Sequence, residues 1–178
     1  MSNVFFVSDT HWGHKNILNF EPYHRPFDTI EEHDQVLIDN WNSVVNKKDI
    51  VYHLGDVVFG KENMKKLGLL NGDKRLIMGN HDCYVTSDYL RYFTKLHGCL
   101  QWQGFCLLTH VPVNPQQLGN RFKYNIHGHL HSKNVTLPQL EGKEAYINDL
   151  RYINVSVEQI NLTPISWDDL KDKYMEKN

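Results

Sequence analysis

The chain has 178 residues, 40% of them apolar, and a formal net charge of -2, from 19 Lys plus Arg against 21 Asp plus Glu. This composition excludes a disordered chain, and the balanced charge disfavours a protein that binds long nucleic acid through its overall charge. No stretch approaches the roughly 20 apolar residues that a membrane helix requires. We therefore expect a globular protein without a membrane span, and at this length a single domain over residues 1–178.

The N-terminus and the cysteines bear on the cellular compartment. Val4 to Val7 is too short to be the apolar core of a secretion signal, and it runs directly into Ser8 and Asp9. The three cysteines are odd in number and have no CxxC spacing, which predicts neither a disulfide framework nor a thiolate zinc site. We expect a cytoplasmic protein whose cysteines pack as small hydrophobic residues.

The first half of the chain alternates strand and helix patterns. A helix is predicted over about residues 29–46, because Thr29 can cap it and Glu32 completes a capping box. A second helix is predicted from Glu62 to Leu70, ended by Asn71 and Gly72. The apolar runs of this half that predict buried strands are Asn3–Val7, Asp49–Leu54 and Arg75–Met78.

The second half is richer in strand patterns. Leu100–Leu108 is typical of a hairpin turning at Gln103-Gly104, and Val135–Ile147 of another turning near Glu141-Gly142-Lys143. A third helix is predicted from Ser166 through Tyr174, with Asp169 in its capping box. The strands expected here are Phe105–Leu108, Tyr124–His127 and Tyr152–Val157.

Five of the predicted strands end in residues that can bind a metal or a phosphate. Ligands of open α/β sheets gather at the carboxyl ends of the strands, so segments far apart in the sequence can meet there. Positions i and i+2 of extended backbone project to the same side, which lets both polar residues of a D-x-H or H-x-H motif face one site. The five sets are Asp9-Thr10-His11, Gly55-Asp56, Gly79-Asn80-His81-Asp82, Thr109-His110 and Gly128-His129-Leu130-His131.

The donor types indicate a catalytic transition-metal site. Carboxylate and amide oxygens with imidazole nitrogens, and no thiolate, suit Mn, Fe, Co, Ni or Zn better than they suit a structural zinc. Seven candidate ligands are enough for two ions if one carboxylate bridges them, and paired ions can activate a water to a hydroxide nucleophile and clamp a phosphate. Phosphate ester hydrolysis is therefore the expected reaction. The seven candidate ligands are Asp9, His11, Asp56, Asn80, His110, His129 and His131.

The motif order D-x-H, G-D, G-N-H-D, H, G-H-x-H over residues 9–131 resembles the signature of the calcineurin-like metallophosphoesterases. Asn154-Val155-Ser156-Val157 and Pro164-Ile165-Ser166 also resemble the end of short, single-domain prokaryotic and phage members. The resemblance implies an α/β fold in which a two-sheet β-sandwich is flanked by helices, in four layers α/β/β/α, with a dinuclear metal site at the strand ends.

The resemblance also implies a role for each motif residue. Asp9, His11 and His131 would bind one ion and Asn80, His110 and His129 the other, with Asp56 as the bridge. His81 would be the catalytic histidine that protonates the leaving oxygen, oriented by Asp82. The cofactors would be two divalent transition-metal ions, with manganese as the first choice and Fe, Ni, Co or Zn as alternatives.

Other residues have weaker signals. His53 and His127 precede motif glycines inside apolar strands, where we expect buried groups behind the ligands. Substrate binding is considered for five residues, by phosphate contact or by stacking on a nucleobase. The alternatives are loop, cap or packing roles and, for Arg25, a solvated charge. These five are Trp12, His14, Asn16, Arg25 and Tyr84.

These observations favour a metal-dependent phosphodiesterase, a hydrolase that acts on a small, nucleotide-like phosphate ester. A phosphomonoesterase is the alternative within enzymes. A nuclease acting on polymeric nucleic acid is disfavoured because no basic stripe is visible. A non-catalytic scaffold, as in the retromer coat, is disfavoured by the complete ligand set together with His81. The oligomeric state is left open by the sequence.

Overall fold

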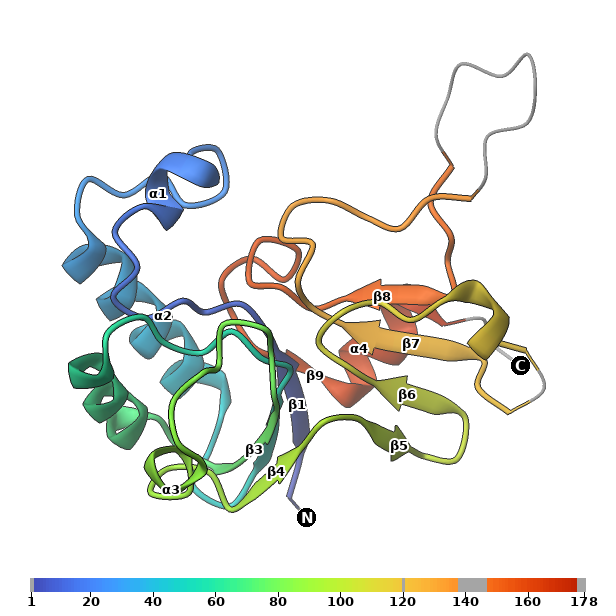
Figure 1. Cartoon of the computed structure of the whole chain (residues 1–178), viewed down its shortest axis with the longest axis horizontal. Coiled ribbons are helices and arrows are strands. Elements are labelled where there is room, and N and C mark those ends of the chain that lie inside the picture. Colours follow the sequence, from blue (N-terminus) through green and yellow to red (C-terminus); the bar gives the residue numbers. More distant parts are fainter. Residues whose placement is uncertain (1, 120, 138–146, 176–178) are drawn as a thin grey trace.

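The computed structural model describes residues 2–119, 121–137 and 147–175, which form a mixed α/β fold with two sheets flanked by helices (Figure 1). The first sheet has the strand order β4-β3-β2-β1-β9. Strands β1 to β4 are parallel to one another, and β9 is antiparallel to β1. The bounds are β1 Val4–Val7, β2 Ile50–His53, β3 Asp73–Ile77, β4 Lys95–His97 and β9 Ile165–Ser166.

The second sheet has the order β5-β6-β7-β8, in which β5 and β6 form an antiparallel hairpin and β6, β7 and β8 are parallel. The predicted hairpin turn is confirmed, because Gln103 and Gly104 both have positive φ, at 50° and 78°. A bridge between Ser8 and Ser156 links the two sheets just past β1 and β8. The strand bounds are β5 Leu100–Trp102, β6 Cys106–Leu108, β7 Tyr124–His127 and β8 Tyr152–Asn154.

The longest helix agrees with its prediction. The helix α2 spans Ile30–Val44, and the side chain of Thr29 accepts a hydrogen bond from the backbone N–H of Glu32 at 3.1 Å. The last helix, α4, spans Trp167–Tyr174 and is capped by Ser166. The remaining short helices are α1 Ile17–Phe20, η1 Lys61–Leu69, α3 Thr86–Tyr89 and η2 Pro115–Gln117.

Three predictions for the local structure need correction or completion. The segment expected as a second α-helix is the 3-10 helix η1. Among the cysteines only Cys106 is buried, whereas Cys83 and Cys99 are exposed. The expected hairpin over 135–147 has paired flanks, where the N–H of Leu137 donates to the carbonyl of Ile147, but its expected turn at 141–143 lies outside the described residues.

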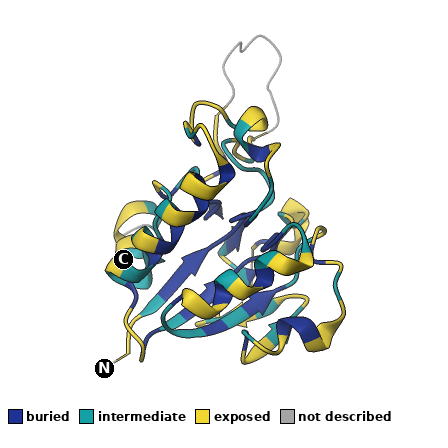
Figure 2. Cartoon of the chain, turned by 90° about the vertical axis from the view of Figure 1, so that its left-hand side faces the viewer, coloured by how far each residue is buried: buried dark blue, intermediate teal, exposed yellow. Residues whose placement is uncertain are grey.

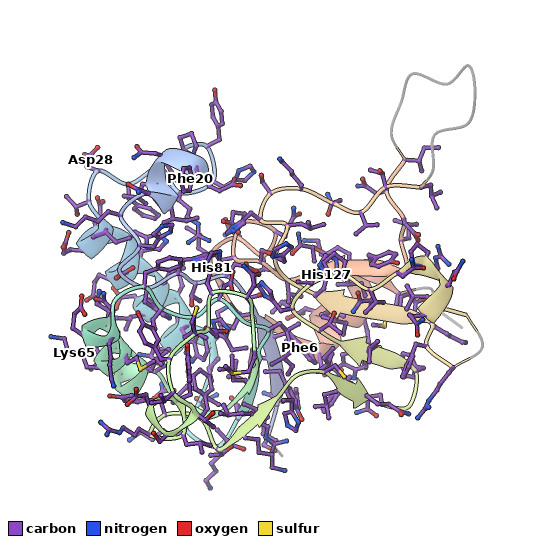
Figure 3. All side chains as sticks on the ribbon, in the orientation of Figure 1. Phe6, Phe20, Asp28, Lys65, His81 and His127 are labelled. Atoms are coloured by element: carbon purple, nitrogen blue, oxygen red, sulfur yellow. The ribbon has the colours of Figure 1, made fainter. Side chains whose placement is uncertain are left out.

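Aromatic side chains fill the space between the two sheets. Phe6 of β1 lies between the two halves of the molecule (Figure 3) and packs on Tyr52 of β2, with 5.8 Å between ring centroids. Trp102 of β5 and Trp167 of α4 contact Phe6 at 5.9 and 6.0 Å. The sheets are therefore joined by a buried apolar layer, which fixes the ends of β1 and β2 relative to the second sheet.

The opposite face of the first sheet is covered by helices, whose inner sides are buried and whose outer sides are exposed (Figure 2). Trp41 of α2 is 1% exposed and stacks on His53 of β2, with 6.5 Å between ring centroids. Within the described ranges, the chain contains no helix with the length and apolar character needed to cross a membrane.

Candidate metal centre

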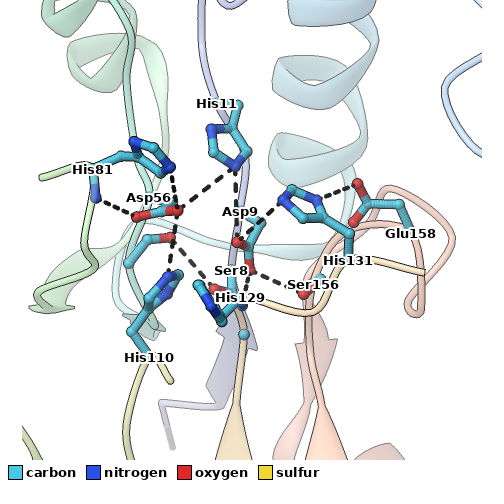
Figure 4. A network of polar contacts seen from close by, with 12 residues as sticks. Ser8, Asp9, His11, Asp56, His81, His110, His129, His131, Ser156 and Glu158 are labelled. Atoms are coloured by element: carbon cyan, nitrogen blue, oxygen red, sulfur yellow. Dashed lines mark hydrogen bonds and ion pairs between the residues drawn. The ribbon is translucent and has the colours of Figure 1, made fainter. Parts of the chain in front are cut away.

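The polar residues that follow the strands converge at the edge where the two sheets meet (Figure 4). They follow the carboxyl ends of β1, β2, β3, β6 and β7. These strands are parallel within each sheet, so their ends lie at one edge and bring together residues up to 122 positions apart in sequence. The fold therefore brings the polar residues of the five motifs together, as we expected from the sequence.

One set of side chains, the first ligand group, consists of Asp9, His11 and His131. One potential ligand atom from each lies within 4.8 Å of the others. Oδ1 of Asp9 is 3.8 Å from Nε2 of His11 and 3.8 Å from Nε2 of His131. The carboxylate and both rings thus point at a common position between them.

The second ligand group consists of Asp56, His110 and His129, whose ligand atoms also lie within 4.8 Å of one another. Nε2 of His110 is 3.3 Å from Oδ2 of Asp56 and 3.0 Å from the amide oxygen of Asn80. The fourth residue expected here, Asn80, therefore lies at the same place as the three others.

Asp56 lies between the two groups. Its Oδ2 atom is 3.3 Å from Nε2 of His110 and 3.8 Å from Nε2 of His11. Oδ1 of Asp56 accepts a hydrogen bond from the backbone N–H of His81 at 2.9 Å. One oxygen of this carboxylate is held by the backbone, and the other is directed to the space between the two groups.

The residues of the first ligand group have the chemistry of a cation site. Oδ1 of Asp9 and both ring nitrogens of His11 are buried and lack a hydrogen-bond partner. Buried polar atoms without a partner are costly, and they call for an ion or water that the side chains alone do not supply. Carboxylate oxygens with imidazole nitrogens suit divalent transition metals. These Asp and His groups could therefore bind metal ions.

Backbone strain is concentrated at the same residues. In the described part of the chain, eight non-glycine residues have positive φ, and five of them belong to the two ligand groups. Left-handed backbone is unfavourable for side chains with a Cβ atom, and such strain gathers at functional sites. The five residues are Asp9 at 57°, His11 at 50°, Asp56 at 56°, His129 at 71° and His131 at 52°.

The pKa shifts show how strongly the carboxylates and rings interact. Burial alone would raise the pKa of Asp9, but His11, His110 and His131 hold it well below its ordinary value. For the histidine His110 the effect of burial is opposite, because burial alone would lower its pKa. Its hydrogen bond to Asp56 and the charge of Asp9 raise the pKa instead. Two negative carboxylates thus favour positive charge beside them, which is the requirement of a cation site.

Two glycines allow the strand ends to approach closely. A Cβ atom on Gly128 would lie 1.9 Å from Oγ of Ser8 and 2.4 Å from Oδ2 of Asp9. A Cβ atom on Gly79 would lie 2.3 Å from Oδ1 of Asp56. Glycine is therefore required at both positions for the carboxylates to lie where they do.

Gly128→Ala should lower the free energy of unfolding by about 1–3 kcal/mol, because the added methyl group meets the buried side chains of Ser8 and Asp9, which hydrogen bonds hold in place. Gly98→Ala is the matched control, since a Cβ atom there meets nothing within 4 Å, and we expect a change within about 0.5 kcal/mol. Denaturant unfolding of both variants measures the difference. Equal stabilities would contradict the close approach at Gly128.

Asp82 has a different contact from the one expected. We expected its carboxylate to orient His81, but both carboxylate oxygens accept backbone hydrogen bonds. Oδ2 accepts from the N–H groups of Asp56 and Gly79 at 2.9 and 2.8 Å, and Oδ1 accepts from Val57 at 3.0 Å. Asp82 therefore fixes the loops that carry Asp56 and Asn80. His81 itself is half exposed, with Nε2 4.0 Å from Oδ2 of Asp56.

Two of the residues considered for substrate binding are buried, which favours the packing alternative for Trp12 and differs from the exposed position expected of a phosphate-binding or solvated Arg25. Trp12 is 0% exposed and belongs to the hydrophobic core, so its ring is not open to stacking. Arg25 is also 0% exposed, and its guanidinium contacts backbone carbonyls, His33 and Glu158 rather than solvent.

The other three substrate-binding candidates stay near the surface. The half-buried ring of His14 stacks on Phe59, with 3.9 Å between centroids, and burial with the neighbouring histidines lowers its pKa to about 4. Asn16 is exposed at the N-cap of α1, and Tyr84 is half-buried beside Tyr89. Their role in substrate binding stays a prediction.

Several supporting residues complete the centre. The rings of His53 and His127 are buried as expected, with His53 against Thr10 at 2.9 Å and His127 against the carbonyl of Gly128 at 2.7 Å. Sequence reasoning missed Glu158, whose Oε1 is 2.9 Å from Nδ1 of His131. Its signal was its position shortly after a strand end, the same signal that identified the ligands.

The chain has relatives among known proteins, and their names state no activity. No family model matches it. It is 39% identical to the uncharacterized protein MJ1445 of Methanocaldococcus jannaschii, over 94% of this chain and 89% of that protein. It is 33% identical to the Gene 66 protein of Mycobacterium phage D29, over 75% of this chain and 80% of that protein.

A solved structure from Aquifex aeolicus has a similar fold. The protein of unknown function AQ665 from Aquifex aeolicus matches with a TM-score of 0.68 and 25% identity, over 97% of this chain and 99% of that chain. Vps29 from Entamoeba histolytica matches with a TM-score of 0.41 and 20% identity, over 85% of this chain and 72% of that chain. By its identity and coverage, the chain belongs to the family of the archaeal protein MJ1445 and the phage D29 Gene 66 protein.

Proposed function

We propose that the protein is a metal-dependent phosphoesterase of the calcineurin-like type, which hydrolyses phosphodiester bonds of a small, nucleotide-like substrate. The observation that carries the proposal is the pair of ligand groups with Asp56 between them, since Oδ2 of Asp56 lies within 4 Å of a ring nitrogen from each group. In this proposal the four-layer sandwich presents a dinuclear centre at its strand ends.

Each ligand group would hold one divalent ion. Asp9, His11 and His131 would hold the first, and His110, His129 and Asn80 the second, with Asp56 shared between them. Bound in such a pair, divalent ions clamp a phosphate, lower the pKa of a water molecule and offset the charge that develops in an in-line displacement. The set includes imidazole nitrogens and no thiolate, which suits manganese, our first choice, as well as iron, cobalt, nickel or zinc.

His81 is the residue best placed to act on the substrate itself. Its side chain is half exposed, whereas the side chains of Asp9, His11, Asp56 and His110 are at most 3% exposed. Its backbone is fixed by Asp56, so the ring can face the substrate without serving as a ligand. As the P–O bond to the leaving group breaks, the imidazolium can give its proton to the departing oxygen.

A substrate and metal screen tests the proposal. Protein stripped of metal is supplied separately with Mn, Ni, Co, Fe or Zn and assayed on phosphomonoesters and phosphodiesters, including cyclic nucleotides. We expect diester hydrolysis only after an ion is restored. Faster hydrolysis of the monoesters would overturn the diester assignment, and hydrolysis that survives stripping would overturn the metal-dependent reaction.

A further inference from the structure

Arg25 is fully buried beside the first ligand group, and its guanidinium contacts four different residues. Nη2 donates to the carbonyl of Asp9 at 2.6 Å, and Nη1 donates to the carbonyl of Thr10 at 3.2 Å. Nε donates to Oε1 of Glu158 at 2.8 Å, and Nη1 lies 3.0 Å from Nε2 of His33. A buried cation with this many partners is fixed in place, so it can fix its partners in turn.

The two carbonyls that Arg25 holds belong to the strained segment of the first ligand group. Asp9 and His11 both have positive φ, at 57° and 50°, and Thr10 lies between them. Such backbone persists only where its surroundings determine it. Because one guanidinium donates hydrogen bonds to two successive carbonyls, it fixes the peptide units that set the directions of the Asp9 and His11 side chains.

Glu158 acts on the third member of the same group. Its side chain is fully buried, and Oε1 accepts a hydrogen bond from Nδ1 of His131 at 2.9 Å. A proton on Nδ1 leaves the Nε2 lone pair free, and Nε2 is the atom that lies 3.8 Å from Oδ1 of Asp9. Arg25, with Nη2 2.6 Å from Oε1, balances the charge of Glu158.

The second ligand group is supported by other parts of the chain. Nδ1 of His110 is 2.7 Å from the carbonyl of Leu54, and the loop of Asp56 is held by Asp82. Among the described residues, neither Arg25 nor Glu158 forms a hydrogen bond or ion pair with Asp56, His110 or His129. The support of the two groups is thus asymmetric.

We propose that Arg25 and Glu158 are positioning residues for the first ligand group alone, so that they set the affinity of one of the two ions. The inference rests on the proposed function, because it requires two ions. Mutation of an outer carboxylate that orients a ligating histidine typically lowers the metal affinity by about 10–100-fold. When the ion pair between Arg25 and Glu158 is broken, we expect the metal affinity of the first group to fall by that factor and the metal affinity of the second group to stay unchanged.

Glu158→Gln tests the inference, because it keeps the size of the side chain and removes the charge that pairs with Arg25. Asp149→Asn is the matched control. It removes the charge of another buried carboxylate, paired with Arg151 at 2.6 Å between Nη2 and Oδ2, outside both ligand groups. Stripped proteins are titrated with cobalt(II), and binding is followed by calorimetry and by the visible spectrum of the ion. We expect Asp149→Asn to bind two ions as the unaltered chain does.

Single-ion backgrounds assign the affected site. In His110→Ala the remaining ion should occupy the first group, and adding Glu158→Gln should weaken its binding by about 10–100-fold. In His131→Ala the remaining ion should occupy the second group, and adding Glu158→Gln should change nothing. Thermal unfolding of each variant without metal verifies that the comparison is made between folded proteins.

The outcomes separate this inference from the proposed function. Unchanged affinity at both groups in Glu158→Gln, or equal weakening at both, would overturn the positioning role while leaving the metal centre intact. An unaltered chain that binds no ion, or one, would overturn the dinuclear centre, and the inference with it. Should Glu158→Gln not fold, Arg25→Lys is used, which keeps the charge and loses the fork that grips two carbonyls.

Discussion

Asp56→Ala is expected to lower the metal content from about two ions per chain towards none, and to reduce phosphodiester hydrolysis more than His131→Ala does. The reason is position. Oδ2 of Asp56 lies 3.8 Å from Nε2 of His11 and 3.3 Å from Nε2 of His110, so this carboxylate serves both groups. His131 belongs to the first ligand group and lies 3.8 Å from Oδ1 of Asp9, so its loss should leave the second ion in place.

The two variants are compared at equal protein concentration. Elemental analysis gives their metal content, and initial rates give their phosphodiesterase activity. Asp28→Ala serves as the control, since it removes an exposed carboxylate outside both ligand groups. It should keep both ions and the full rate. Equal metal occupancy in Asp56→Ala and the unaltered protein would refute the shared position of this carboxylate.

His81→Ala is expected to keep both ions. Its loss of activity should increase with the pKa of the leaving group, because a more basic leaving oxygen depends more on protonation. General acid catalysis is typically worth about 10²–10⁴-fold, most for an alkoxide and little for a nitrophenolate. We expect appreciable hydrolysis of nitrophenyl esters and a far larger loss on esters with alkyl or ribose leaving groups. The substitution removes the ring, 4.0 Å from Oδ2 of Asp56, but keeps the backbone N–H that donates to Oδ1 of Asp56 at 2.9 Å, so the metal centre should survive.

The dependence of log rate on leaving-group pKa distinguishes the acid from its rival role. A steeper slope in His81→Ala supports proton donation. Parallel lines would mean that His81 acts through its charge on the phosphate oxygens, which helps every substrate similarly. Loss of an ion would mean that the side chain is a ligand instead.

The positions of the candidate ligands were predictable because each motif follows a strand. Parallel strands of one sheet end at the same edge, so Asp9 after β1 and Asp56 after β2 had to lie near each other. His110 follows β6 of the second sheet and reaches Asp56 because the strand ends of the two sheets meet. Local signals were sufficient for the helix over 30–44 as well, since its cap at Thr29 and its apolar face lie within one segment.

The environment of individual side chains was not predictable. Arg25 has the local sequence of a solvated cation, but it is buried by contacts that include the carbonyl of Asp9, 16 residues away, and Glu158, 133 residues away. Asp82 could have accepted from either a ring or a backbone amide, and the fold brings three N–H groups to it. Long-range contacts decide both cases, and no periodicity within the sequence encodes them.

Short elements escaped prediction for a different reason. The edge strand β4, Lys95–His97, has only three residues, none of them fully buried, so it lacks an apolar run. The single-turn helices α1 and α3 are too short to display helical periodicity. Each is held by its tertiary contacts rather than by its own sequence pattern.

The ratio of metal to chain, measured together with the rate, tests the central claim most directly. Ions are removed stepwise by chelation and then restored, while bound metal and hydrolysis of an activated phosphodiester are recorded in the same samples. The two ligand groups predict about two ions per chain in the active protein, loss of the rate as they leave and recovery as they return. Full activity with less than about a tenth of an ion per chain would contradict the account.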